Sequence, residues 1–161
     1  MRRTPPLLAA VALVLSACGG SAPKGAAEAA SRLLTAAMND DEAAFEAEID
    51  RAALRDDVRR QVTAMAKTKA LDVEGGPSEF ALDRMISPEA IRLVDAQGRR
   101  RTEAPDPDEV RRMLKPLGER KVCLRQGGGD CLLTFAKGKG GWRLVGMKAR
   151  DMTIQVAEAR F

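Results

Sequence analysis

Hydrophobic positions in the first half of the chain follow a helical period. One stripe, within residues 24–38, consists of Ala26, Ala30, Leu33 and Ala37. Another, running to about Lys69, consists of Leu54, Val58, Val62 and Met65. Residues three or four apart share one face of a helix, so both stretches predict amphipathic helices.

Capping signals predict the shorter helices. Asn39 and Glu42 fit a capping box that opens a helix carrying Phe45. Ser78 follows a Gly-Gly-Pro break and is expected to cap a helix through Ile86.

Two proline-containing signals predict further helix starts. Ser87-Pro88-Glu89 is expected to open a helix that continues to about Val94. Asp106-Pro107-Asp108-Glu109 is a stronger signal, with Pro at the first helical position and Glu at the third. Its helix is expected to end near residues 116–118.

The period changes from helix to strand after Gly118. The β-prone runs 121–125, 131–136 and 142–148 are separated by glycine-rich segments, which predicts an antiparallel meander. Alternation at Met152, Ile154 and Val156 predicts a fourth strand. The chain is therefore expected to form one α+β domain over 24–161, with N-terminal amphipathic helices packed on a C-terminal antiparallel three- to four-stranded meander.

The first 17 residues have the three regions of a secretion signal. A basic start, Met1-Arg2-Arg3, precedes an apolar run from Leu7 to Leu15. A helix over that run would cover about 14 Å, half of a bilayer core, so cleavage is expected rather than a membrane span.

The segment Leu15-Ser16-Ala17-Cys18 resembles the lipobox of bacterial lipoproteins. This resemblance implies that residues 1–17 are removed, that Cys18 carries acyl chains, and that residues 18–23 link the anchor to the domain. Gly19 instead of Asp implies the outer membrane, facing the periplasm, if the source is Gram-negative. The alternative is an ordinary secretory signal with a coincidental cysteine.

Composition narrows the chemistry of the mature chain. Histidine is absent from the sequence, which removes the usual general base and the commonest metal ligand. No catalytic residue, metal site or cofactor is therefore expected. Nucleic acid is disfavoured as a partner by the compartment and by the shortage of stacking aromatic residues.

Charge is unevenly distributed along the mature chain. Residues 18–97 contain 10 basic and 15 acidic side chains, whereas residues 98–150 contain 14 basic and 6 acidic ones. If these segments stay apart in the fold, one end of the domain is acidic and the other basic. Such asymmetry can orient a tethered domain over an anionic surface, although ordinary solvated faces would give the same counts.

Cysteine usage agrees with an oxidising compartment. Once Cys18 carries lipid, Cys123 and Cys131 remain as an even pair, for which a disulfide is expected. A metal site or a redox pair would need further Cys or His ligands, or a C-x-x-C spacing.

One basic run could contact anions. Arg99, Arg100 and Arg101 lie in a polar loop and could bind phosphate or carboxylate groups of the envelope. The alternative is a solvated loop without a specific ligand.

Scattered motifs between residues 24 and 149 resemble the bacterial domain-of-unknown-function family numbered 2939. They are Asn39-Asp40-Asp41 before Phe45, Ile49-Asp50, Leu54-Arg55, Ser87-Pro88-Glu89-Ala90 and Gly141-Trp142-Arg143-Leu144. That family has no established activity to transfer. The resemblance suggests a structural ion pair between Asp50 and Arg55.

These observations predict a non-catalytic, membrane-anchored periplasmic lipoprotein that works through contacts with an envelope protein or an anionic envelope surface. The order of helices before sheet is also similar to small NTF2-like lipoproteins. That similarity implies the alternative function, a small-ligand-binding module with an apolar pocket between helices and sheet.

Overall fold

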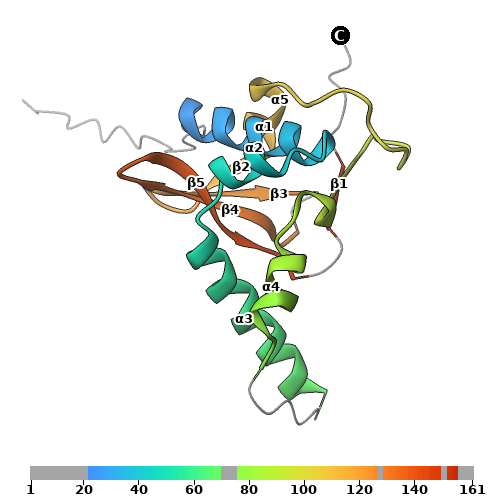
Figure 1. Cartoon of the computed structure of the whole chain (residues 1–161). Helices are drawn as coiled ribbons and strands as arrows, with labels where there is room; N and C mark the ends of the chain where they lie inside the picture. Colours follow the sequence, from blue (N-terminus) through green and yellow to red (C-terminus); the bar gives the residue numbers. More distant parts are fainter. Residues whose placement is uncertain (1–21, 70–75, 127–128, 150–151, 156–161) are drawn as a thin grey trace, which may run out of the picture.

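The chain folds into an α+β domain, which confirms the predicted fold class (Figure 1). The computed structural model describes residues 22–69, 76–126, 129–149 and 152–155. The helical elements of this part are α1 Lys24–Met38, α2 Glu42–Ala47, α3 Arg51–Thr68, α4 Glu79–Met85, the 3-10 turn η1 Pro88–Ala90 and α5 Pro107–Met113. The strands are β1 Ile91–Val94, β2 Leu114–Pro116, β3 Lys121–Arg125, β4 Cys131–Gly138, β5 Gly141–Met147 and β6 Met152–Gln155.

Four strands form one antiparallel sheet in the order β2-β3-β4-β5. The sequence predicts β3, β4 and β5 at nearly the observed bounds, but it places the fourth strand wrongly. That strand is β2, which follows α5 directly and pairs with β3, Leu114 opposite Leu124. The end of α5 at Met113 is thus earlier than expected, because the next three residues are extended and join the sheet.

The last predicted strand exists as β6, but it lies outside the meander. It pairs in parallel with β1, Ile91 opposite Met152 and Leu93 opposite Ile154. The expected helix from Ser87 to about Val94 is therefore wrong beyond the short turn η1. Ile91 and Leu93 are buried while the residue between them is exposed, and this alternation is typical of a strand.

Capping residues set the starts of the helices. Asp106 forms the predicted capping box with Glu109 and starts α5. Ser78 caps α4, as predicted, by accepting a hydrogen bond from the amide of Ala81. For α2 the predicted cap is wrong, because Asp41 and not Asn39 accepts from the amide of Ala44, at 2.9 Å.

Helices cover the sheet from two sides. In Figure 1, α1 and α5 lie above the sheet and α3 extends below it from the β5 side. Alanine dominates the buried face of α1, and its small side chains allow close helix packing. The backbone before α3 also joins the sheet edge, since the amide of Asp50 donates to the carbonyl of Leu144 at 2.8 Å.

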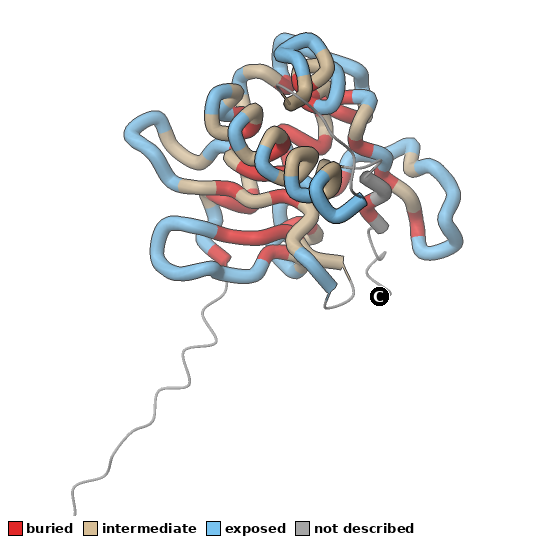
Figure 2. The backbone as a smooth tube through the Cα atoms, turned by 90° about the horizontal axis from the view of Figure 1, so that it is seen from below, coloured by how far each residue is buried: buried red, intermediate tan, exposed pale blue. Residues whose placement is uncertain are grey.

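The core is aliphatic with two aromatic side chains at its centre. Phe45 of α2 and Phe135 of β4 are both fully buried, surrounded by leucines from α1, α3, β3, β4 and β5. Figure 2 shows the buried stretches running through the middle of the molecule, with the exposed turns at its periphery. The shortage of aromatic residues in the sequence is thus matched by a core built mainly of Ala, Leu, Ile and Val.

Candidate functional site

The lipobox and its cysteine lie outside the described residues. The description begins at Ala22, two residues before the first residue of α1, Lys24. No helix in the described part of the chain is both long enough and apolar enough for a membrane span.

Cys123 and Cys131 form a disulfide between β3 and β4. Their Cα atoms are 5.5 Å apart, and Cys123 is fully buried in the sheet. The bond therefore fastens the β3–β4 connection from inside the domain, which suits a structural role.

The three consecutive arginines do not form one basic face. Arg101 points inward, with only 11% of its side chain exposed, and its Nη2 lies 3.3 Å from Oε2 of Glu109. Arg99 bends back to Asp95, with 2.8 Å between its Nε and the Oδ2 of the carboxylate. Of the three predicted contact residues Arg99, Arg100 and Arg101, carboxylates of the same chain thus engage the first and the last.

Asp95 organises this turn. Its Oδ1 accepts hydrogen bonds from the amides of Gln97 and Arg99, both at 2.9 Å. Burial by itself would raise the pKa of Asp95, but the hydrogen bonds from Arg99 and Gln97 outweigh burial and hold the pKa below its ordinary value. The carboxylate is therefore charged at neutral pH and keeps the turn closed.

Arg100 remains exposed and shares a face with Arg92. Val94 and Arg100 are antiparallel bridge partners, so their side chains leave the ribbon on the same side. Arg92 lies two residues before Val94 on β1 and therefore points to that side as well. Both arginines are exposed, and the side chain of neither has an ion-pair or hydrogen-bond partner among the residues that the structure describes.

These two arginines border a groove of about 550 Å³, which we call the β1 groove. Its opposite wall is the C-terminal turn of α1, with Ala37 and Met38. Two acidic residues also line it, Asp40 from the α1–α2 turn and Glu89 from η1. The sequence did not point to Arg92 because the stretch around it was expected to be helical.

Asp50 and Arg55 do not form the predicted ion pair. The side chain of Asp50 caps α3 by accepting from the amide of Ala53 at 3.1 Å. Arg55 is five residues further along, on another side of the helix, and it donates instead to Asp83 of α4.

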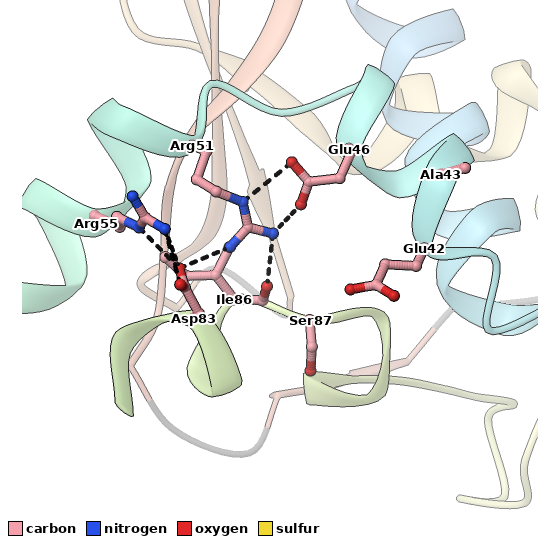
Figure 3. A pocket seen from close by; sticks show the side chains of 8 residues that line it. All are labelled: Glu42, Ala43, Glu46, Arg51, Arg55, Asp83, Ile86 and Ser87. Atoms are coloured by element: carbon pink, nitrogen blue, oxygen red, sulfur yellow. Dashed lines mark hydrogen bonds and ion pairs between the residues drawn. The ribbon is translucent and has the colours of Figure 1, made fainter. Parts of the chain in front are cut away.

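Asp83 is the centre of an ionic cluster that joins three helices (Figure 3). Arg55 of α3 donates to it from Nε and Nη2, both at 2.8 Å, and Arg51 donates from Nη1 at 3.0 Å. Arg51 also donates to Glu46 of α2 and to the carbonyl of Ile86. We call these residues, Glu46, Arg51, Arg55 and Asp83, the Asp83 cluster.

The charges of the Asp83 cluster are satisfied within the cluster. Hydrogen bonds from Arg55 are the main reason that the pKa of Asp83 lies below its ordinary value, followed by the contacts with Arg51. A recess of about 570 Å³ opens in front of the cluster, but its arginines are already paired. We therefore interpret the cluster as a structural link between α2, α3 and α4 and not as a ligand site.

A second surface of interest is formed by two turns of the four-stranded sheet. Lys137 donates its amide to the carbonyl of Arg120 at 2.9 Å, and Nη2 of Arg120 donates back to the carbonyl of Lys137 at 2.8 Å. The β2–β3 and β4–β5 turns therefore lie side by side. We call this surface the basic end; its exposed cationic residues are Lys115, Arg120, Lys121, Lys137, Lys139 and Arg143.

The basic end lies beside the start of α1. Residues 115–121 and 137–143 contain a single acidic side chain, Glu119. Leu117, within the first of these segments, is 41% exposed. A Cβ atom on Gly25 would lie 3.3 Å from Cδ1 of Trp142, the second residue of β5, so the first turn of α1 directly contacts this end of the sheet. Figure 1 shows the β4–β5 turn and the first turn of α1 at the same end of the molecule.

No protein-family model matches the chain, and no curated protein and no solved structure matches it either.

The described residues thus offer two places for contact with other molecules, the basic end and the β1 groove. Within the described part of the chain, no group of three or more His, Cys, Asp or Glu side chains is arranged to hold a metal ion. Both places combine charged side chains with apolar ones, Leu117 at the basic end and Met38 in the β1 groove.

Proposed function

We propose that this chain is a lipid-anchored protein of the bacterial envelope that works by contact and not by catalysis. The leader over residues 1–17 and the lipobox ending at Cys18 support the anchor. Several acyl chains, each contributing about 0.8 kcal/mol per buried CH₂, would hold the domain at its membrane.

The basic end then serves as the face that meets an anionic membrane surface. The observation that carries this proposal is the contact between Gly25 and Trp142, because it puts the cationic turns next to the helix that the linker enters. Residues 18–23, fully extended, span at most about 20 Å, so this end of the domain stays near the anchor.

The charges and the anchor have different roles in this proposal. Each Lys or Arg close to an anionic bilayer contributes about 1 kcal/mol, which is small beside the acyl chains but enough to select one orientation. Leu117, exposed among these charges, can enter the interfacial region of the bilayer. The anchor therefore sets the location and the basic end sets the orientation.

The test uses the full lipidated chain in nanodiscs of anionic phosphatidylglycerol or neutral phosphatidylcholine. We expect the lysines of the basic end to be protected from an amine-labelling reagent in the anionic discs only, and 0.5 M salt to remove the protection. Lys67 and Lys69, exposed at the end of α3, should label equally in both discs.

A matched pair of variants sharpens this test. Replacing Lys121 and Lys139 by Gln should abolish the difference between the discs in the labelling of Lys137, whereas replacing Lys67 and Lys69 by Gln should leave it intact. Equal labelling of the basic end in both discs at low salt would refute the orientation.

A second candidate function is a small-ligand-binding module, favoured by the β1 groove. The β1 groove lies between α1 and β1. The NTF2-like similarity would instead put an apolar pocket between the helices and the four-stranded sheet.

A further inference from the structure

We infer that the β1 groove binds a zwitterion, a small molecule that carries an ammonium group, an oxyanion and an apolar portion. This inference deepens the second candidate function and does not depend on the lipid anchor.

Side chains of both charges line the groove without pairing to one another. Arg92 and Arg100 line the groove without an ion pair to any described residue, and the same is true of Asp40 and Glu89. Two cations and two anions thus share a groove of about 550 Å³ without neutralising each other. A simple anion would be attracted by the arginines but repelled by the acids, whereas a zwitterion satisfies both.

The acidic and the basic side chains of the groove come from different structural elements. The acids come from the α1–α2 turn and from η1, while the arginines come from β1 and the strand-like segment that returns beside it. Bridge pairing puts Arg100 opposite Val94, on the face that Arg92 also shares. Arg92 and Arg100 are therefore suited to a carboxylate or phosphate, and Asp40 and Glu89, elsewhere in the lining, to an ammonium group.

The guanidinium group of Arg101 carries an unsatisfied hydrogen-bond donor. Nη1 of Arg101 is buried and has no hydrogen-bond partner among the described residues, although its Nη2 and Nε are bonded. Buried donors usually have partners, and Arg101 lines the groove. A ligand oxygen entering beside Arg101 would supply an acceptor on the basic side.

The groove also has apolar surface and a suitable size. Ala37, Met38 and Val94 contribute aliphatic groups to its lining. Its volume lies within the range of about 300–1,000 Å³ that is usual for small-molecule sites. The ligand chemistry fits two sources, a short peptide with apolar side chains or a phospholipid whose ethanolamine phosphate head group is the zwitterion and whose acyl chains are the apolar portion.

Four probes separate these possibilities in titrations followed by ligand-observed NMR, with the full chain in a maltoside detergent. The peptide probes are the dipeptide Leu-Leu, its N-acetyl form without the ammonium charge, and its C-terminal amide without the carboxylate charge. The fourth probe is glycerophosphoethanolamine. We expect at least one zwitterion to bind, with each singly charged peptide about tenfold weaker than Leu-Leu if the peptide is the occupant.

Variants assign each charge to its partner. Replacing Arg92 and Arg100 by Gln should remove the preference for Leu-Leu over its amide but keep the preference over its acetyl form. Replacing Asp40 by Asn and Glu89 by Gln should do the reverse. Asp40 has a φ of 53°, a left-handed conformation that Asn also tolerates, so the backbone is not strained by this change.

Controls keep the result interpretable. Arg112→Gln and Glu103→Gln, both at exposed positions outside the groove, should not change binding. Thermal melts of all variants report whether folding is intact.

If glycerophosphoethanolamine alone binds, and the double replacement of the two arginines and that of the two acids each weaken its binding, the inference holds with the lipid head group as the source. Absence of binding by both zwitterions at millimolar concentration, or equal affinity for charged and neutralised peptides, would overturn it.

Discussion

Arg55 donates two hydrogen bonds to the carboxylate of Asp83, from Nε and Nη2, each 2.8 Å long. The two residues lie on α3 and α4, and their pairing links these helices together with the contacts of Arg51 to Asp83 and of Arg59 to Glu79. A bidentate contact of this kind fixes orientation as well as distance.

The first prediction concerns this pair. Asp83→Asn should lower the melting temperature of the protein, because Arg51 and Arg55 both lose their shared carboxylate. Asp56→Asn, which removes an exposed partner of Arg59 on the same helix, should have a smaller effect. Calorimetric melts of the two variants at pH 7 make the comparison, and equal effects would contradict the role of the cluster.

The Asp83 cluster also predicts a pH dependence. The pKa of Asp83 is lowered in the folded protein, so its contribution to stability is fully present above the unfolded pKa of about 3.9. The contribution is lost as the pH falls through the lower, folded-state pKa. The difference in melting temperature between the wild type and Asp83→Asn should therefore shrink below about pH 4, and a difference that grows there would be inconsistent with this sign.

The second prediction compares two phenylalanines. Phe135 is fully buried on β4, whereas Phe80 on α4 is 71% exposed. Phe135→Ala should reduce the free energy of unfolding by about 3–5 kcal/mol, and Phe80→Ala by less than about 0.5 kcal/mol. Urea denaturation measures both, and similar losses would contradict the described core.

The third prediction concerns a close backbone approach. A Cβ on Gly146 would lie 3.2 Å from Oδ2 of Asp57 and 3.4 Å from Cβ of Thr134. Gly146→Ala should therefore cost about 1–3 kcal/mol through overpacking. Gly140→Ala is the matched control, since its Cβ would meet only the mobile end of Arg143 at 3.8 Å. Unfolding of both variants in urea gives the comparison, and an unchanged Gly146→Ala protein would argue against the packing of α3 on β5.

The fourth prediction concerns the disulfide. Opening the short loop between Cys123 and Cys131 should lower the free energy of unfolding by about 2.5 kcal/mol in the chain-entropy model. The test is urea denaturation with and without a reductant. The Cys123→Ala, Cys131→Ala double variant should show the lower stability in both conditions, and a reductant effect that persists in it would point to another cause.

The parts of the fold that the sequence predicts correctly are those that depend on neighbouring residues in the chain. Asp106, Pro107 and Glu109 specify the start of α5 within a few residues, and glycine-rich segments of the sequence separate β3, β4 and β5. These features depend on short-range hydrogen bonds and backbone preferences. The sequence alone therefore suffices for them.

Long-range contacts decided the parts that the sequence does not predict. Ile91–Val94 becomes a strand because it pairs with β6, about 60 residues later, and four residues are too few to distinguish the two periods. The partner of Arg55 is on α4 and not at the nearby Asp50, and Glu109 draws Arg101 away from its neighbours. Arg92 had no separate signal, because one charged residue among three apolar ones in Ile91–Val94 fits a helix as well as a strand.

The central claim is the lipid anchor at Cys18, and intact mass spectrometry of the protein isolated from its own host tests it most directly. We expect a chain that begins at Cys18, with residues 1–17 absent and the mass increased by a diacylglyceryl group and an amide-linked acyl chain. A Cys18→Ser variant should lack this added mass. An intact leader with an unmodified Cys18 thiol would contradict the claim.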